Sequence, residues 1–396
     1  MNFNSTRQLF SLPENVIYLD GNSLGPMPKA AMARVAQTIE GEWAKLLIRG
    51  WNEAGWFEQP RRVGNRIARL IGAETGSITV GDTLSLKMYQ ALAAALPMNP
   101  TRKVVLSCTG NFPTDLYMAQ GLIKALGQGH ELRLVPPEEV EAAITPEVAV
   151  LMLTEVDYRT GRKHNMATLT AKAHSAGALA IWDLAHSAGA LPVDVAAAKA
   201  DFAAGCTYKY LNAGPGAPAF LYIAPKHVDA ATTPLPGWMG HEKPFDFDLD
   251  YKPANGIERM RIGTPPVIAM AALEAALDIW DKVDMAELRV QSIKLCDLLI
   301  AEVESATSRL KLVSPRNGEH RGSQVSFAFH SAYAAVQALI ADGVVGDFRA
   351  PNIMRFGICP LYNSEDEVRT AAAKIAGVIN EGRWNAPEFI AKKAVT

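Results

Sequence analysis

Short apolar runs alternate with helical patterns through the middle of the chain, and this alternation limits the possible folds more than any other feature. The expected strands are SITVG (77–81), KVVLSC (103–108), ELRLV (131–135), VAVLML (148–153) and ALAIWD (178–183). Strands that are apolar throughout and separated by helices indicate a mostly parallel sheet covered by helices on both faces. Two further runs, DFAAGC (201–206) and PAFLYIA (218–224), follow without room for a full helix between them.

The pattern changes past residue 265. Two long helical patterns (266–305) precede QVSFAFH, a further helix, a β-rich segment and a last helix from about residue 364. We therefore expect an α/β protein with a mostly parallel sheet in a large domain (51–265) and a smaller C-terminal α/β domain (266–396). Residues 1–50, which include a helix opened by Pro28, are expected to pack with the smaller domain.

The composition excludes several classes of function. With 39 basic and 41 acidic residues, the net charge of −2 argues against a nucleic-acid or membrane-surface partner. The N-terminus has no secretory signal and no apolar stretch is long enough to span a bilayer, so we expect a cytoplasmic protein. The four cysteines lie far apart and are expected to be reduced, without a disulfide framework or a metal site.

Polar residues follow the expected strands at the points where the strands end. Asp82-Thr83-Leu84-Ser85 follows the first strand and residues 110–115 follow the second, each at a helix start. Thr154, His186 and Lys209 come after three later strands. Carboxyl ends of parallel strands meet at one edge of a sheet, so one shared ligand site is the interpretation we favour. Loops are polar in any protein, which is the alternative for each loop taken alone.

Asp183 and Lys209 are the pair that points to a particular chemistry. Each follows an apolar strand, where an unpaired charge is unfavourable. Taken singly, Asp183 is explained as a backbone cap and Lys209 as a surface lysine. Together they meet two needs of pyridoxal phosphate (PLP): an amine that forms an imine with the cofactor, and a carboxylate against the pyridine nitrogen. Burial also lowers the pKa of a lysine, which frees the amine to react.

Several other positions fit a PLP enzyme that acts on amino acids. The helix start at Leu84 and Ser85 offers backbone N–H groups and a helix dipole to a phosphate. Phe112 is either a ring that stacks on the cofactor or an ordinary core residue, and His186 is either a site residue or a structural histidine. Arg355, in NIMRFGICPLYNS, suits a two-pronged grip on an α-carboxylate, with a surface ion pair as the alternative.

These stretches together resemble the kynureninase family, whose members are PLP enzymes of the aspartate-aminotransferase fold (fold type I). The resemblance covers nearly the whole chain and rests on YLDGNSLGP (18–26), GNFPTD (110–115), WDLAHSAGA (182–190), CTYKYLNAGPGAPAF (206–220), PLPGWMGH (234–241) and RFGICPLYNS (355–364). The combination of YKYLNAGPG with DLAHSAG is specific, whereas GNSLG alone would be weak evidence.

The resemblance implies a role for each matching position. Lys209 is the Schiff-base lysine, Asp183 the partner of the pyridine nitrogen, and Tyr208 the acid/base residue. The remaining cofactor positions are Leu84, Ser85, Phe112, Pro113, Thr114, Asp115, Thr154 and His186, with Trp238 and Thr264 reaching the phosphate from a neighbouring subunit. The substrate-binding positions are Arg355, Trp51 and Ser23. Thr264 stands where some relatives carry asparagine, and Trp51 where animal relatives carry histidine; the second difference hints at a preference for kynurenine over its 3-hydroxy form.

The implied reaction is hydrolysis of L-kynurenine to anthranilate and L-alanine, with 3-hydroxykynurenine as a second candidate substrate. Tryptophan catabolism and supply of NAD precursors are both compatible pathways, and a homodimer with a shared site is expected. The nearest alternatives are other enzymes of the same fold, a cysteine desulfurase or an aminotransferase. A nicotinamide oxidoreductase would require G-x-G-x-x-G after the first strand, and the sequence has no such motif. A non-catalytic relative that kept the fold is the last alternative.

Overall fold

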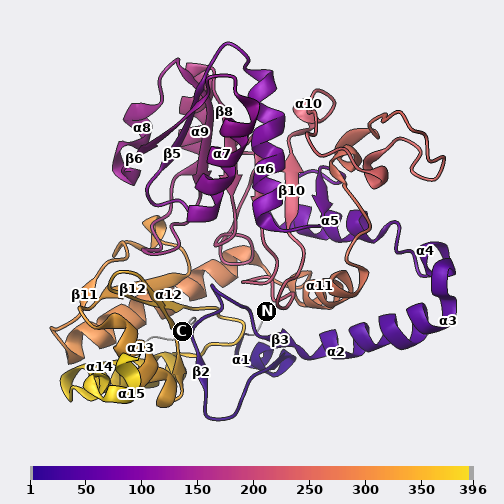
Figure 1. Ribbon diagram of the computed structural model, residues 1–396. Coiled ribbons are helices and arrows are strands. Elements are labelled where there is room, and N and C mark those ends of the chain that lie inside the picture. Colours follow the sequence, from indigo (N-terminus) through magenta and orange to yellow (C-terminus); the bar gives the residue numbers. More distant parts are fainter. Residues whose placement is uncertain (1–2, 392–396) are drawn as a thin grey trace.

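The computed structural model describes residues 3–391 and contains a seven-stranded sheet (Figure 1). The sheet has the order β4-β10-β9-β8-β7-β5-β6. Its strands in chain order are β4 (Ile78–Val80), β5 (Val104–Cys108), β6 (Glu131–Val135), β7 (Val148–Thr154), β8 (Leu179–Asp183), β9 (Phe202–Gly205) and β10 (Phe220–Ile223). Every strand that the sequence predicted in this region is present.

Neighbouring strands run parallel from β6 across to β9, and β10 runs antiparallel to both β9 and β4. A parallel connection needs a crossover of a dozen or more residues, usually a helix. The chain turns back through residues 206–219 without a helix, so β10 reverses direction. The expectation of a mostly parallel sheet in an α/β protein is confirmed.

Helices cover both faces of this sheet. The main ones are α5 (Gln59–Leu70), α6 (Leu84–Ala95), α7 (Pro113–Leu126) and α9 (Met166–Ala176), with short helices α8 (Val140–Ala143) and α10 (Pro225–Val228). Successive strand residues point to opposite faces, so Leu106 joins one core with α5 and α9, and Val105 joins another with α6 and α7. Burial on both faces explains why the strands read as continuous apolar runs.

A second sheet, with the order β11-β12-β15-β14, forms the C-terminal part. Its strands are β11 (Lys311–Leu312), β12 (Gln324–Ala328), β14 (Asp347–Arg349) and β15 (Ile353–Gly357), all paired antiparallel. The long helices around it are α12 (Met285–Ala306), α13 (Ala332–Ala341) and α14 (Glu365–Asn380), followed by α15 (Pro387–Ile390). Their apolar residues form a separate core with this sheet. α14 begins with a capping box between Ser364 and Glu367.

The N-terminal segment contacts both parts. It contains α1 (Phe3–Thr6), β1 (Phe10–Ser11), β2 (Ile17–Tyr18) and β3 (Met27–Pro28). β2 pairs in parallel with β13 (Val344–Val345) of the C-terminal part. Helix α2 (Lys29–Ala36) begins directly after Pro28, as predicted. It packs against α11 (Val267–Trp280), which lies much later in the chain.

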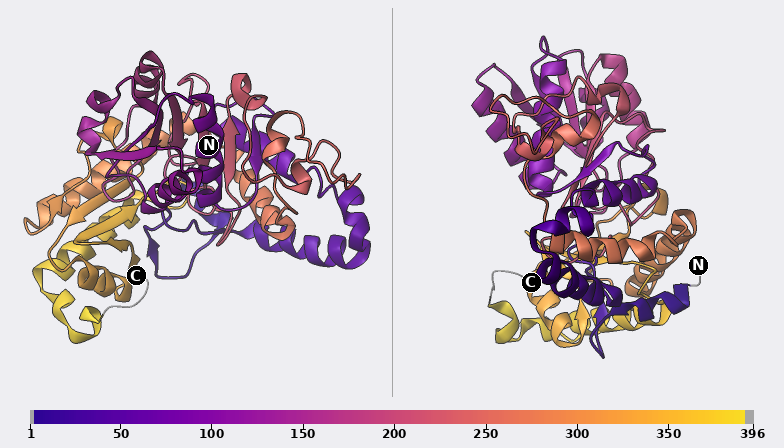
Figure 2. Two further views of the ribbon diagram at one scale, coloured as in Figure 1. Left: turned by 45° about the horizontal axis from the view of Figure 1, so that its top comes forward. Right: turned by 90° about the vertical axis from the view of Figure 1, so that its right-hand side faces the viewer.

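After α2 the chain forms an arm that projects from the body of the molecule (Figure 2). A π-helical stretch (Gln37–Trp43) leads into α3 (Ala44–Leu46) and α4 (Gly50–Glu53). The arm lies on the side of the molecule away from the C-terminal sheet (Figure 1). Within residues 3–391, no helix is both long and apolar enough to cross a membrane.

Candidate active site

The candidate site lies at the edge of the large sheet where its parallel strands end, facing the C-terminal sheet. Several hydrogen bonds join the two parts here. Tyr210 Oη donates to the carbonyl of Ser323 at 2.8 Å, and Arg355 Nη1 donates to the carbonyl of Tyr158 at 2.6 Å. The predicted residues that follow β7, β8 and β9 therefore face residues of the other sheet.

Lys209 and His186 are in direct contact. Lys209 Nζ lies 3.0 Å from His186 Nε2. Burial, together with the positive charges of Lys209, Arg355 and Arg349, holds the pKa of His186 well below its usual value. The imidazole is therefore neutral at physiological pH and its Nε2 accepts a hydrogen bond from the lysine. Its Nδ1 is buried without a hydrogen-bond partner among the described residues.

Two buried carboxyl groups lie near Lys209. Asp183 ends β8 and its Oδ1 accepts a hydrogen bond from Ala185 N at 2.8 Å. Asp115 lies in the first turn of α7, and its Oδ2 is buried with no partner in the described chain. Burial raises the pKa of both groups, and the charge of Lys209 partly offsets this. A cationic ligand atom would stabilise the ionised form of such a carboxyl group.

Tyr208 precedes the lysine and is fixed by the N-terminal segment. Gly25 N donates to the carbonyl of Tyr208 at 2.8 Å. A side chain on Gly25 would come within 2.2 Å of the Lys209 carbonyl oxygen, so only glycine allows this approach. Cys206 and burial raise the pKa of Tyr208 well above its usual value, so the phenol keeps its proton.

The start of α6 has the features of an anion site. Thr83 caps the helix through its side chain, which accepts from Leu86 N. The backbone N–H groups of Leu84 and Ser85 make no hydrogen bond within residues 3–391. Since β4 runs in the same direction as β8 and β9, this helix start lies at the same edge of the sheet as Asp183. Free N–H groups at a helix start favour a phosphate.

Phe112 is neither a core residue nor stacked on another ring. It is 40% exposed, and its ring meets Tyr158 edge-on with centroids 5.2 Å apart. Lys209 Nζ lies 5.8 Å from the centre of the Phe112 ring. Pro113 and Thr114 begin α7 directly after it. Thr154 ends β7 and is buried, with its hydroxyl donating to the carbonyl of Val156. Phe112 thus lies near the lysine, and Pro113, Thr114 and Thr154 lie at a helix start and a strand end.

Arg355 is fully buried and belongs to a group of charged residues that the sequence analysis only partly foresaw. Its Nε donates to Asp347 Oδ1 at 2.8 Å, and its Nη2 donates to the other oxygen of Asp347. Nη2 also donates to Ser23 Oγ at 2.7 Å, which brings two of the three predicted substrate-binding residues together. Asp347, Arg349 and Asp20 were missed, because a cross-strand partner leaves no pattern in the sequence.

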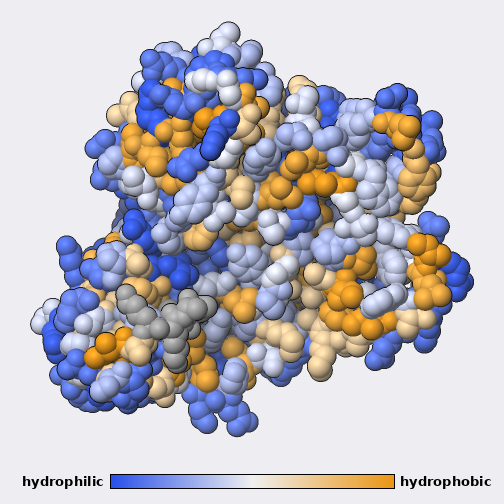
Figure 3. Space-filling model, in the orientation of Figure 1, coloured by the Kyte–Doolittle hydropathy of each residue, from blue (hydrophilic) through white to orange (hydrophobic). Residues whose placement is uncertain are grey.

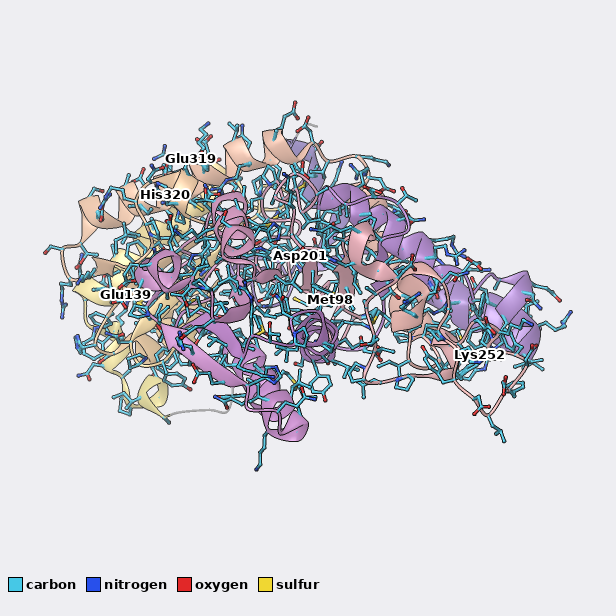
Figure 4. The ribbon with its side chains drawn as sticks, turned by 90° about the horizontal axis from the view of Figure 1, so that it is seen from above. Met98, Glu139, Asp201, Lys252, Glu319 and His320 are labelled. Carbon is cyan, nitrogen blue, oxygen red and sulfur yellow. The ribbon has the colours of Figure 1, made fainter. Side chains whose placement is uncertain are left out.

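Three predicted residues lie elsewhere in this chain: Trp51, Trp238 and Thr264. No hydrogen bond, ion pair or ring contact among residues 3–391 joins them to Lys209. Trp51 is in α4 of the arm and meets Trp56 edge-on. Trp238 is 37% exposed and packs on Phe245, in the loop that leads to Lys252. Figure 4 shows Lys252 at the same end of the molecule as the arm, opposite the C-terminal helices. For Trp238 and Thr264, the prediction involved a neighbouring subunit.

The four cysteines (Cys108, Cys206, Cys296 and Cys359) are all buried and free. Cys296 lies within α12 and Cys359 follows β15. A desulfurase needs an accessible nucleophilic cysteine in a mobile loop of the C-terminal part, and neither position offers one. The described residues also contain no cluster that could hold a metal ion.

Comparison with known proteins identifies the family. A curated protein of Pseudomonas fluorescens named kynureninase is 50% identical over 98% of this chain and 95% of its own length. The chain belongs to the kynureninase family. Residues 288–375 match the family described as the kynureninase C-terminal domain. A kynureninase of Burkholderia pseudomallei is 49% identical, again over 98% of this chain and 95% of its own.

The fold of this kynureninase family member is shared with more distant enzymes. A cysteine desulfurase from Thermococcus onnurineus NA1 superposes with a TM-score of 0.81 at 22% identity, covering 96% of this chain and 98% of its own. A variant of C-DES with glycine covalently linked to its PLP cofactor gives a TM-score of 0.78 at 19% identity, covering 93% and 98%. At these identities the likeness establishes the fold alone, which is that of fold type I.

Proposed function

We propose that this chain is a PLP-dependent enzyme that hydrolyses the Cβ–Cγ bond of L-kynurenine, giving anthranilate and L-alanine. The observation that carries the proposal is 50% identity to a kynureninase over nearly the full length of both proteins. The geometry around Lys209 supplies the chemical reason, because it meets each need of the cofactor and of an amino-acid substrate.

The residues present fit PLP. The free N–H groups of Leu84 and Ser85 suit its phosphate, and the buried carboxyl of Asp183 suits a protonated ring nitrogen. The unpartnered buried atoms, His186 Nδ1 and Asp115 Oδ2, suit polar groups on a ligand that fills this space. We propose that these residues, with Phe112, Pro113, Thr114, Thr154 and Tyr208, hold the cofactor.

PLP, when bound, forms a covalent bond to an amine and withdraws electrons from the substrate carbon attached to that amine. Lys209 is the amine that would hold the cofactor. As a free amine, Lys209 would take the proton from the substrate α-carbon. The neutral His186 accepts a hydrogen bond from the lysine and so orients it. Asp183 keeps a proton on the ring nitrogen.

The substrate end of the site is assigned to Arg355 and Ser23. The guanidinium of Arg355 is positively charged and immobile, and Ser23 Oγ is hydrogen-bonded to it, so together they orient an α-carboxylate. Tyr208 keeps its proton at neutral pH and is the proposed donor of a proton where the carbon–carbon bond breaks. Water enters the reaction at the γ-carbonyl, which becomes the carboxyl group of anthranilate.

A homodimer is the proposed assembly. Helix α2 and the arm carry large apolar side chains that face solvent in the single chain, with Ile48 76%, Met32 70%, Leu47 64% and Trp43 55% exposed. A groove of about 1430 Å³ beside them is lined mainly by apolar residues. Hydrophobic residues gather on this side of the surface in Figure 3. Such a surface is typical of a subunit interface, and a second copy would bring Trp238 and Thr264 to a neighbouring cofactor.

Three finer assignments complete the proposal. Trp51 favours kynurenine over the 3-hydroxy form, with its ring supplied at the dimer interface.

The large domain spans residues 51–265 and the small domain 266–396, with residues 1–50 packed on the latter. Helix α11 lies at the junction because it packs on both α2 and α5. We also propose a cytoplasmic location and a role in tryptophan breakdown through kynurenine, with NAD precursor supply as the second possible use.

The test is to incubate the purified, PLP-loaded protein with L-kynurenine and to follow the fluorescence of anthranilate and the release of L-alanine. L-Cysteine serves as the competing substrate, with sulfide as its product. Anthranilate formation with no sulfide release is expected. A PLP-loaded protein that releases sulfide from cysteine and no anthranilate from kynurenine would overturn the proposal in favour of a desulfurase.

A further inference from the structure

Arg355 reaches the substrate end of the site with one edge of its guanidinium already occupied. Asp347 and Arg355 are paired across β14 and β15, and their side chains are 1% and 0% exposed. Asp347 takes the edge formed by Nε and Nη2. The opposite edge, formed by Nη1 and Nη2, meets Tyr158 and Ser23. An incoming carboxylate therefore binds at this second edge, with Asp347 remaining behind the guanidinium.

A second arginine belongs to the same cluster. Arg349 follows Asp347 by two residues, so both side chains point to the same face of β14. Arg349 Nη2 lies 2.7 Å from Asp347 Oδ2 and 3.2 Å from Ser23 Oγ. Its side chain is 32% exposed, so it is more accessible than Arg355. One carboxylate thus faces two guanidinium groups, and Asp347 alone cannot neutralise both.

Asp20 adds a second carboxyl group to the cluster. The N-terminal segment brings it beside β15, where its backbone bridges to Gly357. Its carboxyl group lies beside Asn22, whose amide nitrogen donates to Asp20 Oδ1 at 3.3 Å while the amide oxygen accepts from Arg355 Nε at 2.9 Å. It is also close enough to Asp347 for the two carboxyl groups to interact electrostatically. Two buried carboxyl groups in one cluster favour a single proton between them, because two neighbouring negative charges repel each other.

The surroundings decide which of the two carboxyl groups carries this proton. Burial and the charge of Asp347 raise the pKa of Asp20 to about 8, although Arg355 opposes the shift. For Asp347, burial opposes ionisation, but Arg355 and its hydrogen bonds lower the pKa below the usual value. At neutral pH the cluster therefore holds two cationic arginines, one anionic Asp347 and one neutral Asp20. Its net charge is one positive charge.

No other group facing the cluster changes this net charge near neutral pH. Tyr18 and Tyr210 interact electrostatically with Asp20, and burial raises the pKa of both phenols, so they stay neutral. Burial and the positive charges of Lys209 and of both arginines lower the pKa of His186, so its imidazole is neutral. Tyr158 interacts electrostatically with Arg349, and its backbone carbonyl accepts a hydrogen bond from Arg355 Nη1. Asn22 and Ser23 are uncharged.

We propose that Asp20 is a positioning residue for the substrate carboxylate: by holding a proton against Asp347, it leaves the arginine pair one positive charge for a monoanion. This inference rests on the proposed function, because it takes the α-carboxylate to bind at Arg355. Loss of the Asp20 proton removes the net positive charge and places a second negative charge beside the bound carboxylate. Affinity for amino acids with a free carboxylate then falls at alkaline pH, while affinity for amines without one does not.

The experiment measures binding of L-alanine to the PLP-loaded protein by the change in cofactor absorbance, from pH 6.5 to 9.5. Asp20→Asn mimics the protonated residue and is compared with wild type and with a control at an exposed aspartate, Asp246→Asn. We expect the ratio of wild-type to Asp20→Asn dissociation constants to rise about tenfold across this range, with its midpoint near the titration of Asp20. Titration of the ligand's amine is common to all variants and cancels in the ratio.

A second measurement uses the wild-type protein alone and so does not depend on the folding of a variant. The decarboxylated analogue of kynurenine, kynuramine, replaces the amino acid in the same titration. Its affinity should lack the alkaline loss seen with L-alanine. Equal pH dependence for the two ligands, or for wild type and Asp20→Asn, would overturn the role of Asp20. Neither result depends on anthranilate formation, so failure of the kynureninase assignment is detected separately.

Discussion

Nζ of Lys209 lies 3.0 Å from Nε2 of His186, and the two residues follow neighbouring strands of the large sheet, β9 and β8. The contact places a reactive amine beside a neutral imidazole at the carboxyl edge of the sheet. It also defines the point around which Asp115, Asp183 and Tyr208 are arranged.

Replacement of Lys209 by alanine should remove the covalent bond between protein and PLP. The reason is that the reducible bond forms at this amine and at no other lysine in the site. Borohydride reduction followed by intact-mass measurement checks this, with Lys163→Ala as the control that keeps the bond. A cofactor adduct that persists in Lys209→Ala would show that another lysine carries PLP.

Asp183→Asn should weaken PLP binding and lower the rate of kynurenine cleavage by about a hundredfold or more, because the ring nitrogen loses its anionic partner. Asp201 is the matched control. It is equally buried but precedes β9, at the opposite edge of the sheet, and its carboxylate contacts His174 and His227. Asp201→Asn should lower the melting temperature. Its PLP affinity, measured at a temperature at which the variant is folded, should not change. PLP titrations of both variants that gave the same dissociation constant would contradict the assignment of Asp183.

Arg355→Lys should raise KM for L-kynurenine by about tenfold to a hundredfold, since a lysine cannot supply the same paired hydrogen bonds. The dissociation constant for PLP should change far less, because Arg355 lies at the substrate end of the site. Steady-state kinetics and a PLP titration on the same preparation measure the two effects. Equal losses in both would mean that Arg355 acts only through the structure of the cluster around Asp347.

Glu155 makes the folding stability depend on pH. It is buried, its Oε2 has no partner among the described residues, and burial raises its pKa to about 7. A raised pKa means that the folded state binds the proton more tightly than the unfolded state. The stability from this group is therefore full below the unfolded value of 4.5 and is lost as the pH rises through about 7.

Glu155→Gln should remove this loss, so the variant should gain stability relative to wild type as the pH rises from 5 to 8. The gain is on the order of 3 kcal/mol at most. Urea unfolding at the two pH values measures it. A difference between variant and wild type that is the same at both pH values would show that Glu155 does not titrate in this range.

Ile48→Asp should weaken the proposed dimer, because it places a charge on the exposed apolar surface of the arm. Val290→Asp is the control, since Val290 is 64% exposed on α12, away from the arm. Sedimentation velocity measures the assembly state. If Trp238 and Thr264 serve a neighbouring subunit, the monomeric variant should also lose PLP affinity; a dimer that survives Ile48→Asp would place the interface elsewhere.

Much of the fold was predictable from the sequence, because burial on both faces makes each strand of the parallel sheet continuously apolar. The strand ends then identified Asp183, His186 and Lys209 without any contact being known. The direction of β10 was not predictable, since an apolar run has the same pattern whichever way it runs. The helix opened by Pro28 was predicted, but not the arm beyond it, several of whose large apolar side chains face solvent in the single chain.

The charged cluster at Arg355 shows a different limit of sequence reasoning. Ser23 and Arg355 were both singled out, yet nothing in the sequence indicated that they touch. Asp347 and Arg349 flank Phe348 in an ordinary-looking strand, and their importance comes from the antiparallel register that sets Asp347 opposite Arg355. Register depends on tertiary packing, so the partner of a buried arginine becomes visible only in the structure.

The N-terminal segment pairs with residues that are made much later. Leu19 N bonds to the carbonyl of Val345, Gly357 N to that of Leu19, and Gly25 N to that of Tyr208. During synthesis the segment leaves the ribosome before these partners and must wait for up to about 340 further residues. A nascent chain can therefore form the sheet that carries Lys209 while its substrate end is still missing. The enzyme becomes competent only when the earliest and latest parts of the chain meet.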